Sequence, residues 1–351
     1  MTTPGSQVRE RPHPADGGTP DPPVPGRRRP SILDLGERFG LVVILVLEIA
    51  FFVVLEPETF GTLANARIVT TSISVLAVLA MGLMLPLLGG RFDVSTGAIL
   101  CVSSVATASA MSRYGLPLGV AIIIGLVLGC AIGALNGLVI AYLGVNSIIA
   151  TIGTGTVLVG LVQAYTEGLP VQNGLSPWLV ELGNQNLLGV PTLFLIAVVV
   201  CFASWYLITQ TPWGRFLTAT GSNLNAARLN GIPARRIVFQ SFVVSGLLAG
   251  IGGIMQIAAQ GSGDPSIGGI PFILPALAAV FLGATTLRPG RYNVGGTLLA
   301  LIFIATTISG LILVGLKPWV TDVFNGGAVV VAIAISAQVR RRRTGSMDVG
   351  G

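Results

Sequence analysis

The sequence predicts an all-α integral membrane protein, and three observations carry this prediction. Of the 351 residues, 52% are hydrophobic and only 10% are charged, whereas about a quarter of the residues in a soluble domain are charged. Apolar runs recur along the chain at close to the roughly 20 residues that a helix needs to cross a bilayer. The 47 glycines are typical of apolar helices that approach one another closely in lipid.

Residues 1–38 form the first segment and differ in composition from the rest of the chain. They are rich in Pro, Gly and Arg, as in RPHPADGGTPDPPVPGRRRP, and offer nothing that could form a core. We therefore expect a disordered cytoplasmic tail. The segment has no apolar h-region and no cleavage site, so it does not fit the pattern of a signal peptide.

A transmembrane domain, residues 39–339, comes next and contains ten candidate spans. They cover residues 40–56, 66–88, 93–112, 116–142, 146–165, 190–208, 237–260, 272–287, 293–315 and 323–339. The eighth is short and contains Pro275, so we expect a broken or tilted helix that lies against protein or a water-filled path. A basic tail, residues 340–351, ends the chain.

The distribution of charge indicates the orientation of these spans. Ten spans place both termini on one side of the membrane. With the N-terminus inside, all of the 20 Lys and Arg residues lie in inner segments except Arg67, Arg113 and Lys317, as the positive-inside tendency requires. Both termini and the loop 209–236 are therefore predicted to be cytoplasmic.

This long loop is basic and contains the pattern of a short helix. In GSNLNAARLNGIP, either Ser222 or Asn223 can cap a helix, because its side-chain oxygen accepts from free backbone N–H groups. Gly231 suits the left-handed residue after a helix, and Pro233 prevents its continuation. We expect a surface helix of about two turns. The loop is either an ordinary basic connection or a docking element for a cytoplasmic partner.

Two acidic residues in apolar surroundings need an explanation. We expect Asp93 to cap the helix that begins near Val94 and to pair with Arg91, because negative charge is favourable at a helix N-terminus. A direct role toward a substrate is the alternative. Glu48 lies within the first span, where an acid is costly and is usually paired or functional. Pairing with a partner group is the hypothesis for Glu48.

Four motifs, in order, resemble those of ribose-type ABC-transporter permeases. TPWGRFLTATGSNLNAARLNGIPARRIVFQSFVVSGLLAGIGGIM is similar to that family's cytoplasmic loop and following span. GGRFDVSTGAIL, LNGLVIAYLGVNSIIATIGT and FLGATTLRPGRYNVGGTLLAL resemble three further motifs. The chain departs from the family pattern at Ala284 and at Pro289-Gly290.

The resemblance implies that the surface helix is a coupling helix seated in a groove of a separate ATP-binding subunit. The implied contact residues are Asn223, Asn225, Ala226, Ala227, Arg228 and Leu229, with Gly231 and Pro233 giving the segment its shape. Arg215, Arg235 and Arg236 can serve this contact or bind lipid headgroups.

The partners and cofactors follow from the same resemblance. The chain is expected to bind no cofactor or metal itself, whereas ATP and Mg belong to the ATP-binding subunit. An extracytoplasmic sugar-binding protein and a second permease copy, identical or closely homologous, complete the assembly in a bacterial cytoplasmic membrane. No nucleic acid is expected as a partner.

If the cargo is a sugar, its path should be uncharged and able to form hydrogen bonds. Polar residues in apolar spans are the candidates, although each can instead bond a neighbouring helix. They are Asn136, Asn146, Thr151, Thr154, Gln163, Gln256, Gln260 and Thr285.

The first functional hypothesis is therefore a permease subunit that carries a monosaccharide or related polyol. The chain is not expected to be an ATPase, because a phosphate-binding P-loop needs a lysine after glycine and the only lysine is Lys317 in LKPW. An ion-coupled secondary transporter of a small polar solute is the alternative, with Glu48 as its intramembrane acid. An intramembrane enzyme is disfavoured, since H-E-x-x-H is absent and the only histidine is His13.

Overall fold

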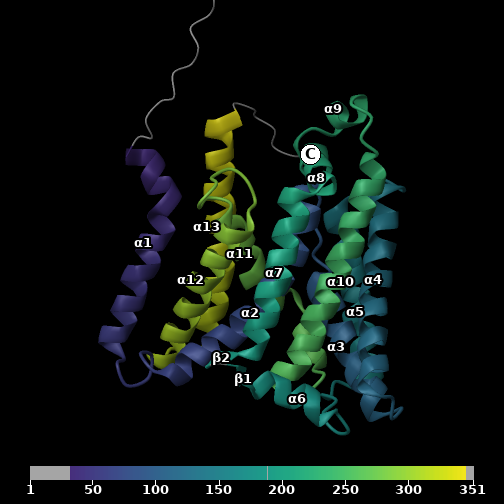
Figure 1. Cartoon of the computed structure of the whole chain (residues 1–351), viewed down its shortest axis with the longest axis vertical. Helices are drawn as coiled ribbons and strands as arrows, with labels where there is room; N and C mark the ends of the chain where they lie inside the picture. The colour runs from purple at the N-terminus through teal and green to yellow at the C-terminus, as the bar shows by residue number, and fades with distance from the viewer. Residues whose placement is uncertain (1–31, 188, 345–351) are drawn as a thin grey trace, which may run out of the picture.

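The computed structural model describes residues 32–187 and 189–344, and they are mostly helical (Figure 1). The helices are α1 Ile32–Leu55, α2 Leu63–Leu88, α3 Thr96–Ser112, α4 Leu118–Ala141, α5 Ser147–Thr166, α6 Pro177–Asn184, α7 Thr192–Gln210, α8 Pro212–Ser222, α9 Leu224–Leu229, α10 Ala234–Gln260, α11 Ile270–Gly283, α12 Val294–Leu313 and α13 Pro318–Thr344. A 3-10 turn, η1, spans Pro265–Gly268. Two short strands, β1 Asn186–Leu187 and β2 Val190–Pro191, pair antiparallel.

Seven of the described helices are long and apolar enough to cross a membrane, namely α2, α4, α5, α7, α10, α12 and α13. Three shorter apolar helices, Phe39–Leu55, Thr96–Ser112 and Phe272–Gly283, coincide with the other three predicted spans. The prediction of a multi-pass helical membrane protein is confirmed, with seven spans rather than ten by this measure. Pro275 lies inside the short helix α11, as expected from the sequence.

Two predicted boundaries differ from the structure. Helix α1 begins at Ile32, inside the segment predicted as a tail, and α13 continues to Thr344, into the predicted C-terminal tail. Hydropathy marks the part of a helix that suits lipid, whereas backbone hydrogen bonding continues into polar residues that form helices well. The rest of both predicted tails, residues 1–31 and 345–351, lies outside the described residues.

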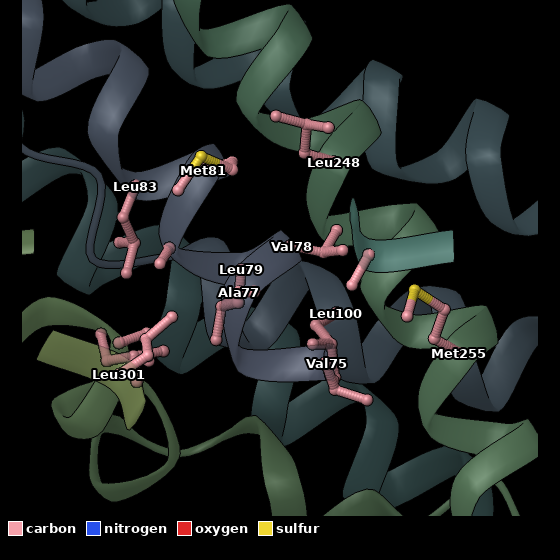
Figure 2. Close-up of a cluster of buried hydrophobic side chains, with 14 of the residues drawn as sticks. Val75, Ala77, Val78, Leu79, Met81, Leu83, Leu100, Leu248, Met255 and Leu301 are labelled. Carbon is pink, nitrogen blue, oxygen red and sulfur yellow. The ribbon is translucent and has the colours of Figure 1, made fainter. Parts of the chain in front are cut away.

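Helix α2 lies at the centre of the core. Figure 2 shows its apolar side chains, among them Leu79 and Met81, together with Leu100 of α3, Leu248 of α10 and Leu301 of α12. Leu79 and Met81 are fully buried. Helices α1, α11, α12 and α13 lie to one side of α2 in Figure 1, and α3, α4, α5 and α10 to the other. This buried helix thus joins two groups of helices.

Glycines bring α4 and α10 into backbone contact. A Cβ atom added at Gly246 would lie 2.2 Å from the carbonyl oxygen of Gly129, and one at Gly133 would lie 2.3 Å from that of Phe242. No side chain larger than hydrogen fits at these positions without moving a helix. The two helices therefore pack through small residues, as membrane helices commonly do.

The two ends of the molecule carry different elements. Helices α8 and α9 lie at one end, together with the Ile32 end of α1 and the Thr344 end of α13 (Figure 1). Helix α6 and the β1–β2 hairpin lie at the opposite end. The start of the first helix and the end of the last helix therefore lie at the same end of the molecule as the basic loop.

Candidate coupling surface and solute cavity

Helix α9 is a short capped helix on the surface of the molecule. The Asn223 side chain accepts a hydrogen bond from the backbone N–H of Ala226 at 2.9 Å, so Asn223 is the N-cap. Ser222 instead ends α8, where its hydroxyl donates to the carbonyl of Thr218 at 2.8 Å. Gly231 has a φ of +75°, the left-handed conformation that the sequence predicted.

One face of α9 is turned outward. Leu229 is 90% exposed, and Asn225, Ala226 and Arg228 are exposed as well. Ala227, which we expected at a partner contact, is only 4% exposed. A helix resting on a protein surface must bury one side, and Ala227 is on that side. Its side chain is therefore not available to a docked partner, whereas that of Leu229 is accessible.

Helix α8 attaches α9 to the membrane helices. A Cβ atom added at Gly221 would lie 2.0 Å from the carbonyl oxygen of Leu88, at the end of α2. The Trp213 indole donates to the side-chain oxygen of Gln240 on α10 at 3.0 Å. A Cβ atom at Gly214 would lie 2.1 Å from the carbonyl of Ile208 on α7. Helix α8 therefore packs closely against three membrane helices.

A basic hollow lies beside α9. Its volume is about 510 Å³, and it is lined by Tyr142, Arg228, Pro233, Ala234, Arg235 and Arg236. The structure thus brings together three of the four arginines of the loop, whereas Arg215 is exposed on α8. Such a hollow suits anionic groups, either on a docked protein or on lipid.

The loop between α2 and α3 contains the buried carboxylate of Asp93, which is 2% exposed. One of its oxygens accepts from the backbone N–H of Ser95 at 3.1 Å and from the Ser95 hydroxyl at 2.5 Å. The other accepts from the Ser245 hydroxyl on α10 at 3.1 Å. Among the described residues, these serines and not Arg91 are its partners, so the predicted ion pair is wrong. Helix α3 begins at Thr96 with Ser95 as N-cap, so Asp93 precedes the cap.

Two residues predicted for the solute path hold this loop in place. The Asn136 amide donates to the Ser95 hydroxyl at 2.8 Å. The Thr151 hydroxyl accepts from the backbone N–H of Val94 at 3.0 Å. Both side chains are buried. Their hydrogen bonds tie α4 and α5 to the loop, which is a structural role.

Gln256 and Gln260, by contrast, face a cavity of about 630 Å³. The cavity is lined in part by α6 and the β1–β2 hairpin, which lie at the end opposite α9 (Figure 1). Both glutamines belong to α10. Ala259 of the same helix also lines the cavity. The remaining lining residues come from α2, α6, the hairpin and α11, and are Arg67, Ile68, Thr71, Ser72, Val75, Leu76, Gly183, Asn184, Asn186, Pro191, Phe272 and Pro275. The cavity combines convergent polar groups with an apolar floor, as small-molecule sites do.

Residues 65–333 match the family described as branched-chain amino acid transport system, permease component. The chain belongs to this family of permeases. It is 33% identical to the ribose import permease of Escherichia coli (strain K12) over 89% of this chain and 97% of that one. Identity is 32% to the ribose import permease of Bacillus subtilis (strain 168), with 86% and 92% covered. It is 28% to the D-allose transport system permease of Escherichia coli (strain K12), with 87% and 93% covered. No solved structure matches.

The match of the permease to its family includes both candidate sites. The matched range, residues 65–333, begins two residues before Arg67 and contains α8, α9 and every lining residue of the cavity and of the hollow. Helix α1 lies outside the matched range. The two sites are therefore parts of the shared permease domain.

Four predicted path residues of the permease do not line the cavity and form hydrogen bonds elsewhere. Asn146 caps α5 by accepting from the backbone N–H of Ile148 at 3.0 Å. The hydroxyls of Thr154 and Thr285 donate to backbone carbonyls of their own chain segments. Gln163 is exposed and donates to the carbonyl of Pro265 at 3.3 Å. Spacing along a helix does not distinguish these bonds from a solute contact.

Glu48 of the permease joins α1 to α12. One carboxylate oxygen accepts from the hydroxyls of Thr307 and Thr306. The other oxygen is buried with no hydrogen-bond partner among the described residues. Glu48 was expected to pair with a partner group. The groups that its carboxylate contacts are two hydroxyls of the same chain, where α1 meets α12.

Three further polar residues line the cavity at the end that carries α6, and the sequence did not single them out as site residues. Asn184 and Asn186 come from α6 and β1, and Arg67 from the second turn of α2. The sequence did show Arg67 as one of three cations outside the predicted cytoplasmic segments, which was a usable signal.

Proposed function

We propose that the permease is the membrane-spanning subunit of an ABC importer that carries a monosaccharide or a related polyol. The description of the family refers to branched-chain amino acids. The relatives matched over nearly their whole length are instead ribose and allose permeases, and autoinducer 2 import permeases match as well. We infer the transported solute from these similar permeases rather than from the family description, so a hydroxylated small molecule is the better assignment.

The exposed helix α9 is the observation that carries this proposal. Its outward face presents Leu229, Asn225 and Arg228, and its base is tied through α8 to three membrane helices. A short rigid helix that protrudes from a membrane domain suits a groove on a cytoplasmic partner. Because the sequence has no P-loop for ATP, that partner is the ATP-binding subunit, which also binds the Mg.

The contacts of α8 suggest how force reaches the solute. In this mechanism, ATP binding draws the two ATP-binding subunits together and displaces α9. Helix α8 passes the displacement to the end of α2 and to α10. The far ends of α2 and α10 form two walls of the outer cavity. A tilt of either helix therefore changes the shape of the cavity at the opposite side of the membrane.

Other partners complete the proposed importer. A soluble sugar-binding protein delivers cargo to the end that carries α6, and a second permease copy, identical or homologous, forms the other half of the path. The assembly lies in the cytoplasmic membrane of a bacterium, with α9 inside. Ion coupling through Glu48 is less well supported, because hydroxyls of α12 already bind that carboxylate.

Purification from the native membrane in mild detergent, followed by mass spectrometry, tests the assignment. We expect a P-loop ATPase to co-purify with the permease, and Leu229→Asp to abolish this association. Uptake that survives ATP depletion and stops when the ion gradient collapses, with no ATPase recovered, would contradict the proposal.

A further inference from the structure

The outer cavity has an unusual charge balance. Among the described residues, Arg67 is the only charged one that lines it, and none of the lining residues is acidic. The Arg67 Nε atom is buried and has no hydrogen-bond partner within the described part of the chain. Arg67 as a whole is half-buried, and a buried N–H donor without an acceptor is unfavourable, so this donor is available to an acceptor on a ligand in the cavity.

The polar groups around Arg67 are arranged along two facing helices. Thr71 follows Arg67 by four residues on α2 with Ser72 next to it, and Gln256 and Gln260 are four residues apart on α10. Asn184 and Asn186 lie on the elements that close the outer end. Hydroxyl and amide groups both donate and accept, which suits a solute with several hydroxyls.

The depth of the cavity favours a small solute over a side chain of a docked protein. The lining of α2 runs from Arg67 to Val75 and Leu76. Eight residues of helix rise about 12 Å, so the cavity extends more than two helical turns below Arg67. Its volume of about 630 Å³ lies within the usual range of small-molecule sites.

We propose that this cavity binds a small polyhydroxylated solute that carries one carboxylate or phosphate group, with Arg67 as the anion-binding residue. A planar guanidinium donates two parallel hydrogen bonds to such a group, which a neutral sugar cannot match. The inference rests on the proposed import function and names an acidic sugar derivative as a solute of this permease.

Binding to the purified full-length permease in nanodiscs tests the proposal. The probes are D-gluconate and ribose 5-phosphate, with D-ribose and D-allose as neutral counterparts, measured by calorimetry and by the shift in unfolding temperature. We expect at least one acidic probe to bind more tightly than both neutral sugars. Arg67→Gln, which keeps a polar side chain but removes the charge, should weaken that binding by on the order of ten-fold.

Three further variants make the test specific. Arg113→Gln is the control, because Arg113 is predicted on the same side of the membrane as Arg67. Arg113 stacks on Tyr165 and does not line the cavity, so this substitution should leave binding unchanged. Arg67→Lys keeps the charge and should retain part of the affinity. Gln256→Met should weaken acidic and neutral probes alike, because it removes a contact to hydroxyls. Size-exclusion profiles show whether each variant is folded.

Specific results would overturn the proposal. They are equal affinity for neutral and acidic probes, an equal effect of Arg67→Gln and Arg113→Gln, or no binding of either acidic probe. If Arg67→Gln instead weakens only the association with a purified binding protein, Arg67 docks a partner and the solute assignment is wrong. Co-purification of the ATPase does not involve Arg67, so failure here leaves the import function standing.

Discussion

The hydroxyl of Ser245 donates to a carboxylate oxygen of Asp93 at 3.1 Å and joins segments 152 residues apart in the chain. Asp93 lies in the loop after α2, and Ser245 lies in the interior of α10. Gly90 of the same loop lies against Gly221 of α8. The hydrogen bond therefore connects the segment that supports α9 to the helix that carries Gln256 and Gln260.

Removal of this hydrogen bond should weaken the permease measurably. We expect Ser245→Ala to lower the free energy of unfolding by about 1 kcal/mol, the usual net value of such a bond. Asp93→Ala should cost more, because it leaves the hydroxyls of Ser95 and Ser245 without their acceptor. Thermal unfolding in detergent measures both. Equal stability of wild type and Asp93→Ala would show that the network does not hold the loop.

The contact between α8 and the end of α2 should not tolerate a side chain. Gly221→Val places atoms against the carbonyl oxygen of Leu88, which lies 2.0 Å from the position of an added Cβ atom, so α8 must move. We expect transport and ATPase stimulation to be lost while the protein still inserts into the membrane. Gly119→Ala is the matched control, since no atom lies within 4 Å of its added Cβ. Normal uptake by Gly221→Val would contradict the proposed transmission through α8.

The outward face of α9 should carry the coupling contact. Leu229→Asp puts a charge on a side chain that is 90% exposed, so the fold should tolerate it while an apolar groove on the ATPase should not. Uptake and co-purification of the ATPase should both fall by at least on the order of ten-fold. Leu229→Met is the conservative control and should retain both. Full uptake by Leu229→Asp would show that this face of α9 is not part of the contact with the ATPase.

The orientation of the permease is testable by thiol labelling. In a background without Cys101, Cys130 and Cys201, we introduce Asn173→Cys at the α6 end and Ser222→Cys at the end of α8. Both positions are exposed. A membrane-impermeant thiol reagent should label Asn173→Cys in intact cells and Ser222→Cys only after the membrane is opened. The opposite labelling pattern would show that the predicted orientation in the membrane is wrong.

Glu48 should be dispensable for energy coupling. Glu48→Gln keeps the side-chain oxygen that accepts from the hydroxyls of Thr306 and Thr307 and removes the charge. ATP-dependent uptake should be close to that of wild type, and stability should be unchanged or slightly higher because a neutral amide is less costly to bury than a carboxylate. Loss of uptake with a stable, inserted protein would revive the ion-coupled alternative.

Much of the candidate coupling surface could be predicted from local sequence. Asn223, Gly231 and Pro233 act on the backbone within a few residues, so their pattern located α9 closely. The pattern did not show which face of α9 is buried, because Ala227 is turned inward by its contact with the rest of the permease. The predicted pairing of Asp93 with Arg91 was also wrong, since the position of Ser245 depends on how α10 packs.

The sequence by itself determined the helical membrane class and the short surface helix, and it predicts that both termini face the cytoplasm. Each follows from hydropathy, charge or capping over short stretches, where the physical cause and the residues are close together. Only the tertiary structure selected Gln256 and Gln260 from eight polar candidates and placed Arg67 beside them. A cavity forms where distant helices fail to fill the space between them, and no local pattern encodes that gap.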